Sequence, residues 1–434
     1  MIMQKKLKNT LNDYPFLVYS DNEGNIYEDR NLLMVAREGR KIRLVELEEL
    51  IELPEGSNLF FIPDSHPIGY DPFKKSLVIC KKGLGVATFL PPAYTITGIS
   101  AFYKKKNYNL PLFAYAAIGW YNNKFYVPAF RVDKDIRQEC RLFNQKKVLE
   151  NIKVLKKKFP KNRVFDQLII CATEYYCPAA RNFFLNRYEA PLPTSPFCNS
   201  KCIGCISNQP KESGFPPTQY RIKMIPTPEE IAEIAIFHLN TAKKPIVSFG
   251  QGCEGEPLMV YDTIAEAIRI IRNKTKKGAI NINTNGSLPD KLEKIIKAGL
   301  DSARISINSF IKENYVSYFK PINYNFEDVL QSISLLRKYK VWTSINYFNF
   351  PGLTNSKEEI NALYEYIEKL KFNMIQWRNL NIDPDLYVGN IQLELINQPN
   401  LNVKKLIEKL KENFPWLIHG YFNPYIETIK SYNF

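Results

Sequence analysis

The chain has 434 residues, a formal net charge of +15, and 45% hydrophobic residues. These values are typical of a soluble globular protein with a sizeable core and two or three domains. No apolar run approaches the ~20 residues that a membrane span requires, and the basic start MIMQKKLKNTLND lacks the apolar segment of a secretory signal. We therefore expect a cytoplasmic protein without a membrane partner, whose eight cysteines are reduced thiols that include a metal site.

The positive charge is concentrated in the N-terminal part of the chain. Residues 1–165 hold 28 Lys and Arg against 17 Asp and Glu, whereas the remaining residues hold 31 against 27. A basic surface attracts polyanions such as nucleic acid, but a lysine-rich composition also keeps a protein soluble. Because the basic runs are short, as at 104–106 and 156–158, charge alone does not identify a partner.

Residues 14–135 are predicted to be rich in β-strands. Segment 17–29 has the pattern of two strands around an Asn/Glu/Gly turn, and segment 119–130 has two aromatic strands around an Asn-Asn turn. A helix is predicted over 143–159, with apolar residues on one face and Pro160 at its end. We place a domain boundary shortly after this helix.

From about residue 225 onward, predicted helices alternate with short strands. The first helix, 226–239, begins at Thr227 with Pro228 at its first position. The alternation predicts an α/β fold with a parallel sheet, and one more strand near 186–196 would give six strands, a partial (β/α)6 TIM-like barrel. The five other predicted strands are 245–250, 279–286, 302–308, 341–350 and 373–379. The predicted domains are a basic β-rich domain (1–165), the barrel (166–385) and a C-terminal helical extension (386–434).

The strongest motif is PFCNSKCIGCIS, which places Cys198, Cys202 and Cys205 in a C-x3-C-x2-C arrangement. Three thiolates on one short loop can bind a soft metal centre such as an iron–sulfur cluster. Three ligands for a four-iron cluster leave one iron open, which favours a catalytic role. The alternative is a zinc site completed by a fourth residue, since C-x2-C pairs are common in zinc sites.

This motif resembles the signature of the radical S-adenosylmethionine (radical SAM) superfamily, and the resemblance covers roughly residues 190–380. It implies that the three cysteines hold a [4Fe–4S] cluster whose open iron binds the amino and carboxylate groups of SAM. One position departs from the family pattern, because Gly204 stands where an aromatic residue usually precedes the last cysteine. That departure bears on packing against the adenine and leaves the cluster ligands as they are.

The resemblance extends to the ends of the later strands. Gly255 and Glu256 look like the end of the family's Gly-Gly-Glu-type motif, whose glutamate accepts hydrogen bonds from the SAM amino group, and Glu254 is a rival for this role. An ammonium group needs an anionic acceptor, and a glycine lets the backbone approach closely. The family's polar strand-end positions, which bind the SAM ribose and carboxylate, correspond here to Asn283, Asn285, Ser306, Asn308, Asn346 and Arg378. A surface turn at Asn285 and a surface salt bridge at Arg378 are the alternatives.

Three further cysteines lie near these motifs in sequence. Cys171 and Cys177 precede the cysteine loop. Cys253 lies within GQGCEGEPL, residues 250–258, which contains Gly255 and Glu256 and is called the SAM-motif loop. Together they could bind a second, auxiliary iron–sulfur cluster, whereas Cys80 and Cys140 fit the usual role of buried small hydrophobic residues.

These patterns predict a radical SAM enzyme that cleaves SAM reductively and abstracts hydrogen from a substrate. The resemblance implies a one-electron reductant such as ferredoxin or flavodoxin. The sequence leaves three substrate classes open: RNA, a phosphorylated metabolite and a peptide. We expect the basic N-terminal domain to deliver or cover the substrate. The alternative is a non-catalytic iron–sulfur or zinc module with a nucleic-acid-binding basic domain.

Overall fold

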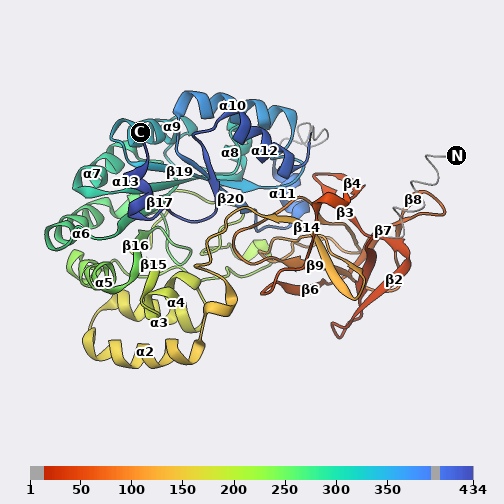
Figure 1. Ribbon diagram of the computed structural model, residues 1–434, viewed down its shortest axis with the longest axis horizontal. Coiled ribbons are helices and arrows are strands. Elements are labelled where there is room, and N and C mark those ends of the chain that lie inside the picture. Colours follow the sequence, from red (N-terminus) through yellow and green to blue (C-terminus); the bar gives the residue numbers. More distant parts are fainter. Residues whose placement is uncertain (1–13, 392–400, 434) are drawn as a thin grey trace. The chain divides into compact units, whose positions relative to one another are not determined.

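The computed structural model describes residues 14–391 and 401–433 of the chain (Figure 1). Its contacts divide the chain into two compact units, neither of which is continuous in sequence. Unit 1 comprises Met1–Lys134, Phe348–Asn361 and Trp377–Pro415, and unit 2 comprises Asp135–Tyr347, Ala362–Gln376 and Trp416–Phe434. The predicted domain boundaries at residues 165 and 385 remain predictions, because the two units describe packing in the folded chain and not which segments fold on their own.

Unit 1 is built from antiparallel strands. A nine-stranded sheet has the order β10-β14-β13-β1-β2-β7-β12, with β5 added beside β14 and β8 beside β7, and β11-β3-β4 and β6-β9 form smaller sheets. The strands are β1 Phe16–Ser20, β2 Ile26–Leu33, β3 Val35–Glu38, β4 Lys41–Leu44, β5 Leu50–Glu52, β6 Asn58–Ile62, β7 Ser65–Asp71, β8 Ser76–Ile79, β9 Gly85–Phe89, β10 Tyr94–Ile96, β11 Ile99–Ser100, β12 Phe102–Lys104, β13 Gly119–Tyr121 and β14 Lys124–Arg131.

Both predicted hairpins are confirmed. Strands β1 and β2 pair across the first turn, and β13 and β14 pair across Asn122 and Asn123. Both asparagines have positive φ, 48° and 58°, as a two-residue hairpin turn requires.

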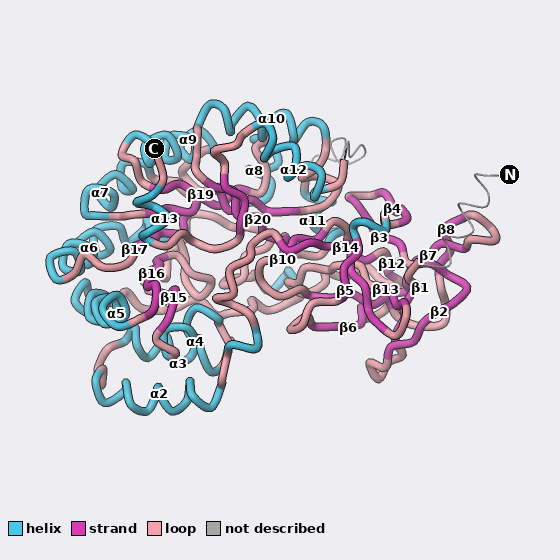
Figure 2. The backbone as a smooth tube through the Cα atoms, in the orientation of Figure 1, coloured by secondary structure: helices cyan, strands magenta, loops and turns pink. Residues whose placement is uncertain are grey.

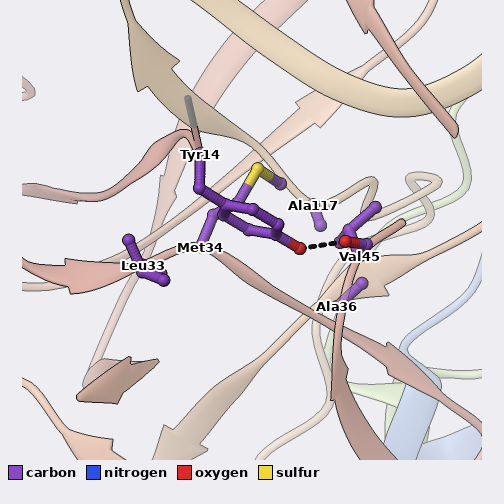
Figure 3. Packing of buried hydrophobic residues seen from close by; sticks show 6 residues of the cluster. All are labelled: Tyr14, Leu33, Met34, Ala36, Val45 and Ala117. Carbon is purple, nitrogen blue, oxygen red and sulfur yellow. Dashed lines mark hydrogen bonds between the residues drawn. The ribbon is translucent and has the colours of Figure 1, made fainter. Parts of the chain in front are cut away.

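The core of unit 1 contains a cluster of buried side chains around Tyr14 (Figure 3). The Tyr14 hydroxyl donates a hydrogen bond to the backbone oxygen of Val45, so the ring is buried without losing a partner for its polar end. The ring packs with the other members of the cluster, namely Leu33, Met34, Ala36 and Ala117. Of the two cysteines expected to be buried, Cys80 is buried, but the expectation for Cys140 is wrong because Cys140 is exposed.

Later segments of the chain join unit 1 through polar contacts. The buried Asp383 carboxylate accepts hydrogen bonds from Lys104 Nζ (2.6 Å) and from the Leu110 backbone N–H (2.8 Å). Asn349 Nδ2 donates to the Ile96 backbone oxygen at 2.8 Å. These bonds explain why Phe348–Asn361 and Trp377–Pro415 belong to the β-rich unit.

Unit 2 contains a parallel sheet of seven strands, in the order β15-β16-β17-β18-β19-β20-β21, which curls into part of a TIM-like barrel. The predicted α/β class and partial barrel are thus confirmed, and the structure adds a seventh strand to the six expected. The strands are β15 Arg187–Pro191, β16 Lys243–Phe249, β17 Ala279–Thr284, β18 Ser302–Ile307, β19 Trp342–Asn349, β20 Met374–Asn379 and β21 Ile418–Gly420.

Helices α5, α6, α7 and α9 lie along the outer face of this sheet (Figures 1 and 2). Helix α5 starts as predicted, with Thr227 and Glu230 forming a capping box. The helices of the chain are α2 Gln145–Lys158, α3 Arg163–Thr173, α4 Pro178–Phe184, α5 Pro228–Thr241, α6 Tyr261–Lys274, α7 Pro289–Gly299, α8 Lys312–Phe319, α9 Phe326–Lys338, α10 Lys357–Leu370, α11 Pro384–Asn390, α12 Val403–Asn413 and α13 Ile426–Ser431. No helix of the described ranges is long and apolar enough to cross a bilayer.

Side chains alternate between the two faces of the barrel strands. On β17 and β18, the residues Ile280, Ile282, Ala303 and Ile305 have no solvent exposure and form the apolar face toward the helices. The residues between them are polar, so the opposite face of the sheet differs from the branched aliphatic filling that is usual in TIM barrels. This polar face is where the sequence predicts the functional site.

A buried histidine on α5 predicts an acid sensitivity of the fold. His238 is fully buried, and its Nε2 contacts the Tyr188 backbone oxygen at 2.7 Å. Burial lowers the pKa of His238 to about 4, against about 6.5 in the unfolded chain. Between these values only the unfolded chain binds the proton, so the contribution of the neutral imidazole is complete above pH 6.5 and is lost as the pH falls toward 4, by up to about 3 kcal/mol.

We expect His238→Gln to remove this part of the pH dependence. The measurement is the free energy of unfolding in urea for both proteins at pH 7 and at pH 4.5. Equal losses of stability in the wild type and the variant would contradict the assignment to His238.

Candidate active site

The cysteine motif lies on the loop that follows β15, the first strand of the barrel. The three thiols lie close enough for the charge of one to affect the next: Cys205 raises the pKa of Cys198, and both raise the pKa of Cys202. Burial is the larger cause, and it raises the pKa of Cys198 to about 11 and that of Cys202 well above its usual value. Metal binding must therefore displace protons from these thiols.

Arg221 is a charged neighbour of the thiols that the sequence analysis missed. Its Nη2 lies 3.6 Å from Cys205 Sγ, and its Nε donates to Ser207 Oγ at 3.2 Å. The positive charge lowers the pKa of both Cys198 and Cys202, which partly offsets burial. The available signal was an arginine shortly after a three-cysteine loop, where anionic thiolates need a compensating cation.

The thiols fit an iron–sulfur cluster by their donor chemistry. Within residues 14–391 and 401–433, no three Cys, His, Asp or Glu side chains converge on a point that could hold one metal ion. The cysteines of a four-iron cluster each bind a different iron, so they need not converge. Three soft sulfur ligands on one loop, with a cation beside them, match this chemistry.

Asn285 holds the cysteine loop against the end of β17. Its Nδ2 donates to Asn199 Oδ1 (2.9 Å) and to Ser200 Oγ (3.1 Å), while its Oδ1 accepts from the Ser287 backbone N–H (3.0 Å). Ser200 Oγ also lies 2.8 Å from the Tyr324 hydroxyl. The amide group of Asn285 is thus engaged in positioning the loop that carries the cysteines.

The SAM-motif loop after β16 is joined to the cysteine loop by backbone hydrogen bonds. The Gly255 N–H donates to the Ser195 oxygen at 2.6 Å, and the Glu256 N–H donates to the Phe197 oxygen at 2.7 Å. A Cβ on Gly255 would lie 2.0 Å from the Phe197 oxygen, so only glycine permits this approach.

The two glutamates of this loop have different surroundings. Glu254 Oε1 accepts from the backbone N–H groups of Gly250 and Gln251, and its Oε2 accepts from both the N–H and the hydroxyl of Thr194 and from the Ser195 N–H, at 2.6–2.9 Å. Five donors exceed the roughly four acceptor positions of a carboxylate. Glu254 therefore serves as an internal brace between the two loops.

Glu256 is buried but accepts fewer hydrogen bonds. Its Oε1 accepts from the Leu258 N–H at 3.0 Å and from the Thr284 hydroxyl, and its Oε2 accepts from the Asn285 N–H at 2.8 Å. Burial raises the pKa of this carboxyl to about 7. With three donors for about four acceptor positions, Glu256 retains capacity for one more, and a cation beside it would stabilise its charged form.

The other predicted positions lie on neighbouring strands. Asn283 Nδ2 donates to the Phe249 oxygen at 3.0 Å, and Asn308 Nδ2 donates to the Asn314 oxygen at 3.1 Å. Ser306 on β18 is in register with Asn346 on β19, and both are half-buried. Asn346 Oδ1 is buried without a hydrogen-bond partner, which makes it a candidate acceptor for a ligand. Arg378 belongs to unit 1.

A polar network on the same face of the sheet was not predicted. Glu189 Oε1 accepts from Ser248 Oγ (2.6 Å) and Asn423 Nδ2 (2.8 Å). Arg304 Nη1 donates to Gln376 Oε1 at 3.2 Å, and Gln376 Nε2 donates to Asn423 Oδ1 at 3.0 Å. The signal was in the sequence, because polar residues recur at every second position of the predicted strands.

The three cysteines predicted as candidates for a second cluster, Cys171, Cys177 and Cys253, all lie in unit 2. Cys171 on α3 and Cys253 in the SAM-motif loop are both buried, and their interaction lowers the pKa of Cys171 and raises the pKa of Cys253, which Cys177 also raises. The Cys177 backbone N–H donates to the Cys171 oxygen at 2.9 Å.

A comparison with known protein families matches the part of the chain that carries the cysteine loop and the SAM-motif loop. Residues 192–367 match the family model described as the Radical SAM superfamily. The chain therefore carries a radical SAM domain. The matched residues begin before the cysteine loop and extend beyond β19, so they include the cysteines, the SAM-motif loop and strands β16–β19.

Similar proteins share only part of the chain. A probable dual-specificity RNA methyltransferase RlmN from Thermotoga sp. (strain RQ2) is 26% identical over 199 residues, which are 44% of this chain and 54% of the relative. A GTP 3',8-cyclase from Chlorobaculum tepidum is 28% identical over 170 residues, which are 39% of this chain and 46% of the relative. The chain thus spans about half the length of these relatives.

Among solved structures, the FeFe-hydrogenase maturase HydG from Carboxydothermus hydrogenoformans is 14% identical with a TM-score of 0.38, over 66% of this chain and 71% of that one. At this score the likeness is too slight to transfer an activity or a detailed architecture.

The close approach at Gly255 predicts a sensitive position. We expect Gly255→Ala to push the SAM-motif loop away from the cysteine loop and to destabilise the protein by about 1–3 kcal/mol, the usual cost of overpacking. The measurement is the free energy of unfolding of the full chain. Gly389→Ala is the matched control, because a Cβ there meets nothing within 4 Å. An equal effect in both variants would contradict the role of the approach.

Proposed function

We propose that this protein is a radical SAM enzyme that cleaves SAM reductively and abstracts a hydrogen atom from its substrate in the reducing cytoplasm. The observation that carries the proposal is the joining of a three-thiol loop to a buried, incompletely satisfied carboxylate through paired backbone hydrogen bonds. A metal centre and a cationic ligand group can thereby be bound side by side.

Cys198, Cys202 and Cys205 would hold the [4Fe–4S] cluster, and Arg221 would stabilise their thiolate forms. When bound and reduced, the cluster supplies the electron that splits SAM into methionine and a 5′-deoxyadenosyl radical. The protein contributes the binding and orientation of SAM and the exclusion of water.

Glu256 would accept the hydrogen bond of the SAM ammonium group. It has the acceptor capacity that Glu254 lacks, and a cation beside it would relieve the cost of burying its charge. Glu254 would not contact SAM itself; it would hold Gly255 and Glu256 in place.

The remaining SAM contacts are assigned by position along the strand ends. Ser306 and Asn346 lie side by side, and the open Asn346 Oδ1 suits a ribose hydroxyl donor. Asn285 would act through the cysteine loop. Asn283, Asn308 and Arg378 stay candidates for the ribose and carboxylate on the family pattern alone.

For the substrate we favour RNA over a phosphorylated metabolite or a peptide. The excess positive charge of residues 1–165 suits a polyanion, and the name of the Thermotoga relative refers to RNA. A ferredoxin or flavodoxin would be the electron donor. A second iron–sulfur cluster bound by Cys171, Cys177 and Cys253 is the role that we assign to those thiols.

The test is anaerobic reconstitution with iron and sulfide, reduction with dithionite and addition of SAM. We expect cluster bands in the optical spectrum and formation of 5′-deoxyadenosine. A protein without cluster bands and without this product would contradict the proposed enzymatic activity. That result would favour a zinc module whose basic residues bind nucleic acid.

A further inference from the structure

Strand β8 lies at an edge of the unit 1 sheet and is apolar on both of its faces. Within the described residues it pairs only with β7 (Figure 1). Val78 packs against a core cluster that includes Cys80, whereas Leu77 and Ile79, which alternate with them, are exposed. The solvated face of an antiparallel sheet is usually polar. A group of exposed apolar side chains in its place marks a binding surface.

The pairing register extends this exposed face along β7 and onto β12. Residues 66, 68 and 70 of β7 share one face, because side chains alternate along a strand. Their partners are Tyr103 on β12, Ile79 and Leu77, respectively, and all three partners are exposed. Paired residues point to the same face of a sheet. The three side chains therefore form a row about 14 Å long, which is four residues of β7 at ~3.4 Å each.

Phe73 extends this row into the turn between β7 and β8. It is 88% exposed, more than any other large apolar side chain of the described residues. The Asp71 carboxylate accepts hydrogen bonds from the backbone N–H groups of Phe73 (2.9 Å) and Lys74 (3.0 Å), which hold the backbone of the turn. An ordered turn thus presents the ring to solvent, so little backbone entropy is lost on binding. We call Phe73, Leu77, Ile79 and Tyr103 together the hairpin face.

Lysines surround the hairpin face. Six exposed lysines lie in the turn, directly after β8 or at the end of β12 and after it: Lys74, Lys75, Lys81, Lys82, Lys105 and Lys106. Three of them form ion pairs, at 2.9–3.6 Å, with Asp71, Asp29 and Asp64. Among the described residues, Lys75, Lys81 and Lys105 have no ion-pair partner. The surface therefore keeps an excess of positive charge, which is complementary to a polyanion.

We propose that the hairpin face binds a single-stranded segment of RNA. The rings of Phe73 and Tyr103 stack on bases, and the lysines around them contact phosphates. Aromatic side chains within a cationic surface are the usual means of binding a single strand without sequence preference. The length of the row matches about four nucleotides at the ~3.4 Å spacing of successive phosphates. The proposal rests on the RNA substrate favoured above and adds the surface that holds it.

A peptide is the other ligand that an open strand edge can take. A peptide that adds a strand to β8 is bound by backbone hydrogen bonds and by pockets for alternate side chains. Such binding requires neither a projecting aromatic ring such as Phe73 nor a border of unpaired lysines. The combination of rings and cations therefore favours the nucleic acid.

The experiment measures binding of the full-length protein to a short, labelled oligouridine RNA by fluorescence anisotropy. We expect Phe73→Ala and Tyr103→Ala each to raise the Kd about fivefold or more, because stacking on one base contributes about 1–3 kcal/mol. Phe73→Leu keeps an apolar side chain but lacks a flat ring, so it should behave as Phe73→Ala does, and Phe73→Trp should retain the wild-type Kd. Wild-type affinity in Phe73→Leu or in both alanine variants would overturn the proposal.

The salt dependence of binding tests the lysines. Replacing Lys75 and Lys81 together by alanine should lower the slope of log K against log salt by about 1.4, at about 0.7 for each phosphate contact with a single strand. Replacing Lys153 and Lys157 on the exposed face of α2 removes the same charge and is the matched control. An equal change of slope in both double variants would show attraction to the net charge alone and would overturn the assignment.

Two further ligands and one parallel assay separate the remaining outcomes. An RNA duplex, whose bases are already stacked, should bind less tightly than the single strand, and equal binding would overturn the stacking role. Polyglutamate that binds as tightly as the RNA would do the same. Formation of 5′-deoxyadenosine is measured on the same protein. Product without RNA binding would overturn the surface and leave the radical chemistry, whereas Phe73-dependent RNA binding without product would contradict the proposed function alone.

Discussion

Replacing Cys198, Cys202 and Cys205 together by alanine is expected to lower the iron of the reconstituted protein from about four atoms per chain to background, and to abolish 5′-deoxyadenosine formation. The loop carries no other soft ligand beside these thiols: its neighbours are a hydroxyl on Ser207 and the guanidinium of Arg221. Without the sulfurs, a cation such as Arg221 disfavours a metal ion at this place. The measurements are iron and sulfide per chain, the optical spectrum and product formation.

Two cysteines outside the motif serve as controls for this prediction. Cys80→Ala removes a buried thiol from unit 1, and Cys140→Ala removes an exposed one. Both variants should keep the iron content and the product of the wild type. Iron retained by the triple variant at wild-type level would contradict the assignment of the primary site.

The barrel could be predicted because its signals are local. Five strands between residues 245 and 379 each fall between helices with clear apolar periodicity, and the structure has β16–β20 at these places. Strand β21 was not predicted, because Ile418–Gly420 has only three residues and is recognisable as a strand only by its pairing with β20. A strand of that length carries no period of its own.

The strand pattern marks a polar face in unit 2, but it does not tell which polar side chains meet there. Single polar residues in strands can be read as solvent-facing, and only the curl of the sheet brings Glu189, Ser248 and Asn423 to one point. The same holds for Arg221, which meets the thiols through a loop without regular structure. Spacing along the chain identifies ligands on one loop, but it does not identify partners that the fold brings in from a distance.

The choice between the two glutamates also needed the structure. In the sequence, Glu254 and Glu256 are both carboxylates beside a glycine, and the motif alone leaves them as rivals. Hydrogen-bond capacity distinguishes them, because five donors surround Glu254 and three surround Glu256. The distinction can be tested by two substitutions of equal size.

Glu256→Gln is expected to raise the Kd of the reconstituted protein for SAM by tenfold or more, with a smaller loss in thermal midpoint than Glu254→Gln, because its amide opposes one backbone N–H instead of two. The amide keeps the shape of the carboxyl but loses the charge, and a hydrogen bond to a charged group contributes about 1.5–3 kcal/mol. The fold tolerates a neutral group here, since burial already raises the pKa of Glu256 to about 7.

Glu254→Gln should behave in the opposite way. Its amide would present N–H groups to backbone N–H groups of Thr194 and Ser195, so we expect a loss of about 1–3 kcal/mol in the free energy of unfolding. The weaker SAM binding of this variant should follow its loss of loop structure and recover with added osmolyte. SAM affinity and thermal midpoint are measured for both variants. Loss of SAM binding in Glu254→Gln at an unchanged midpoint, with Glu256→Gln binding normally, would reverse the assignment, because a brace cannot fail without loosening the loops it joins.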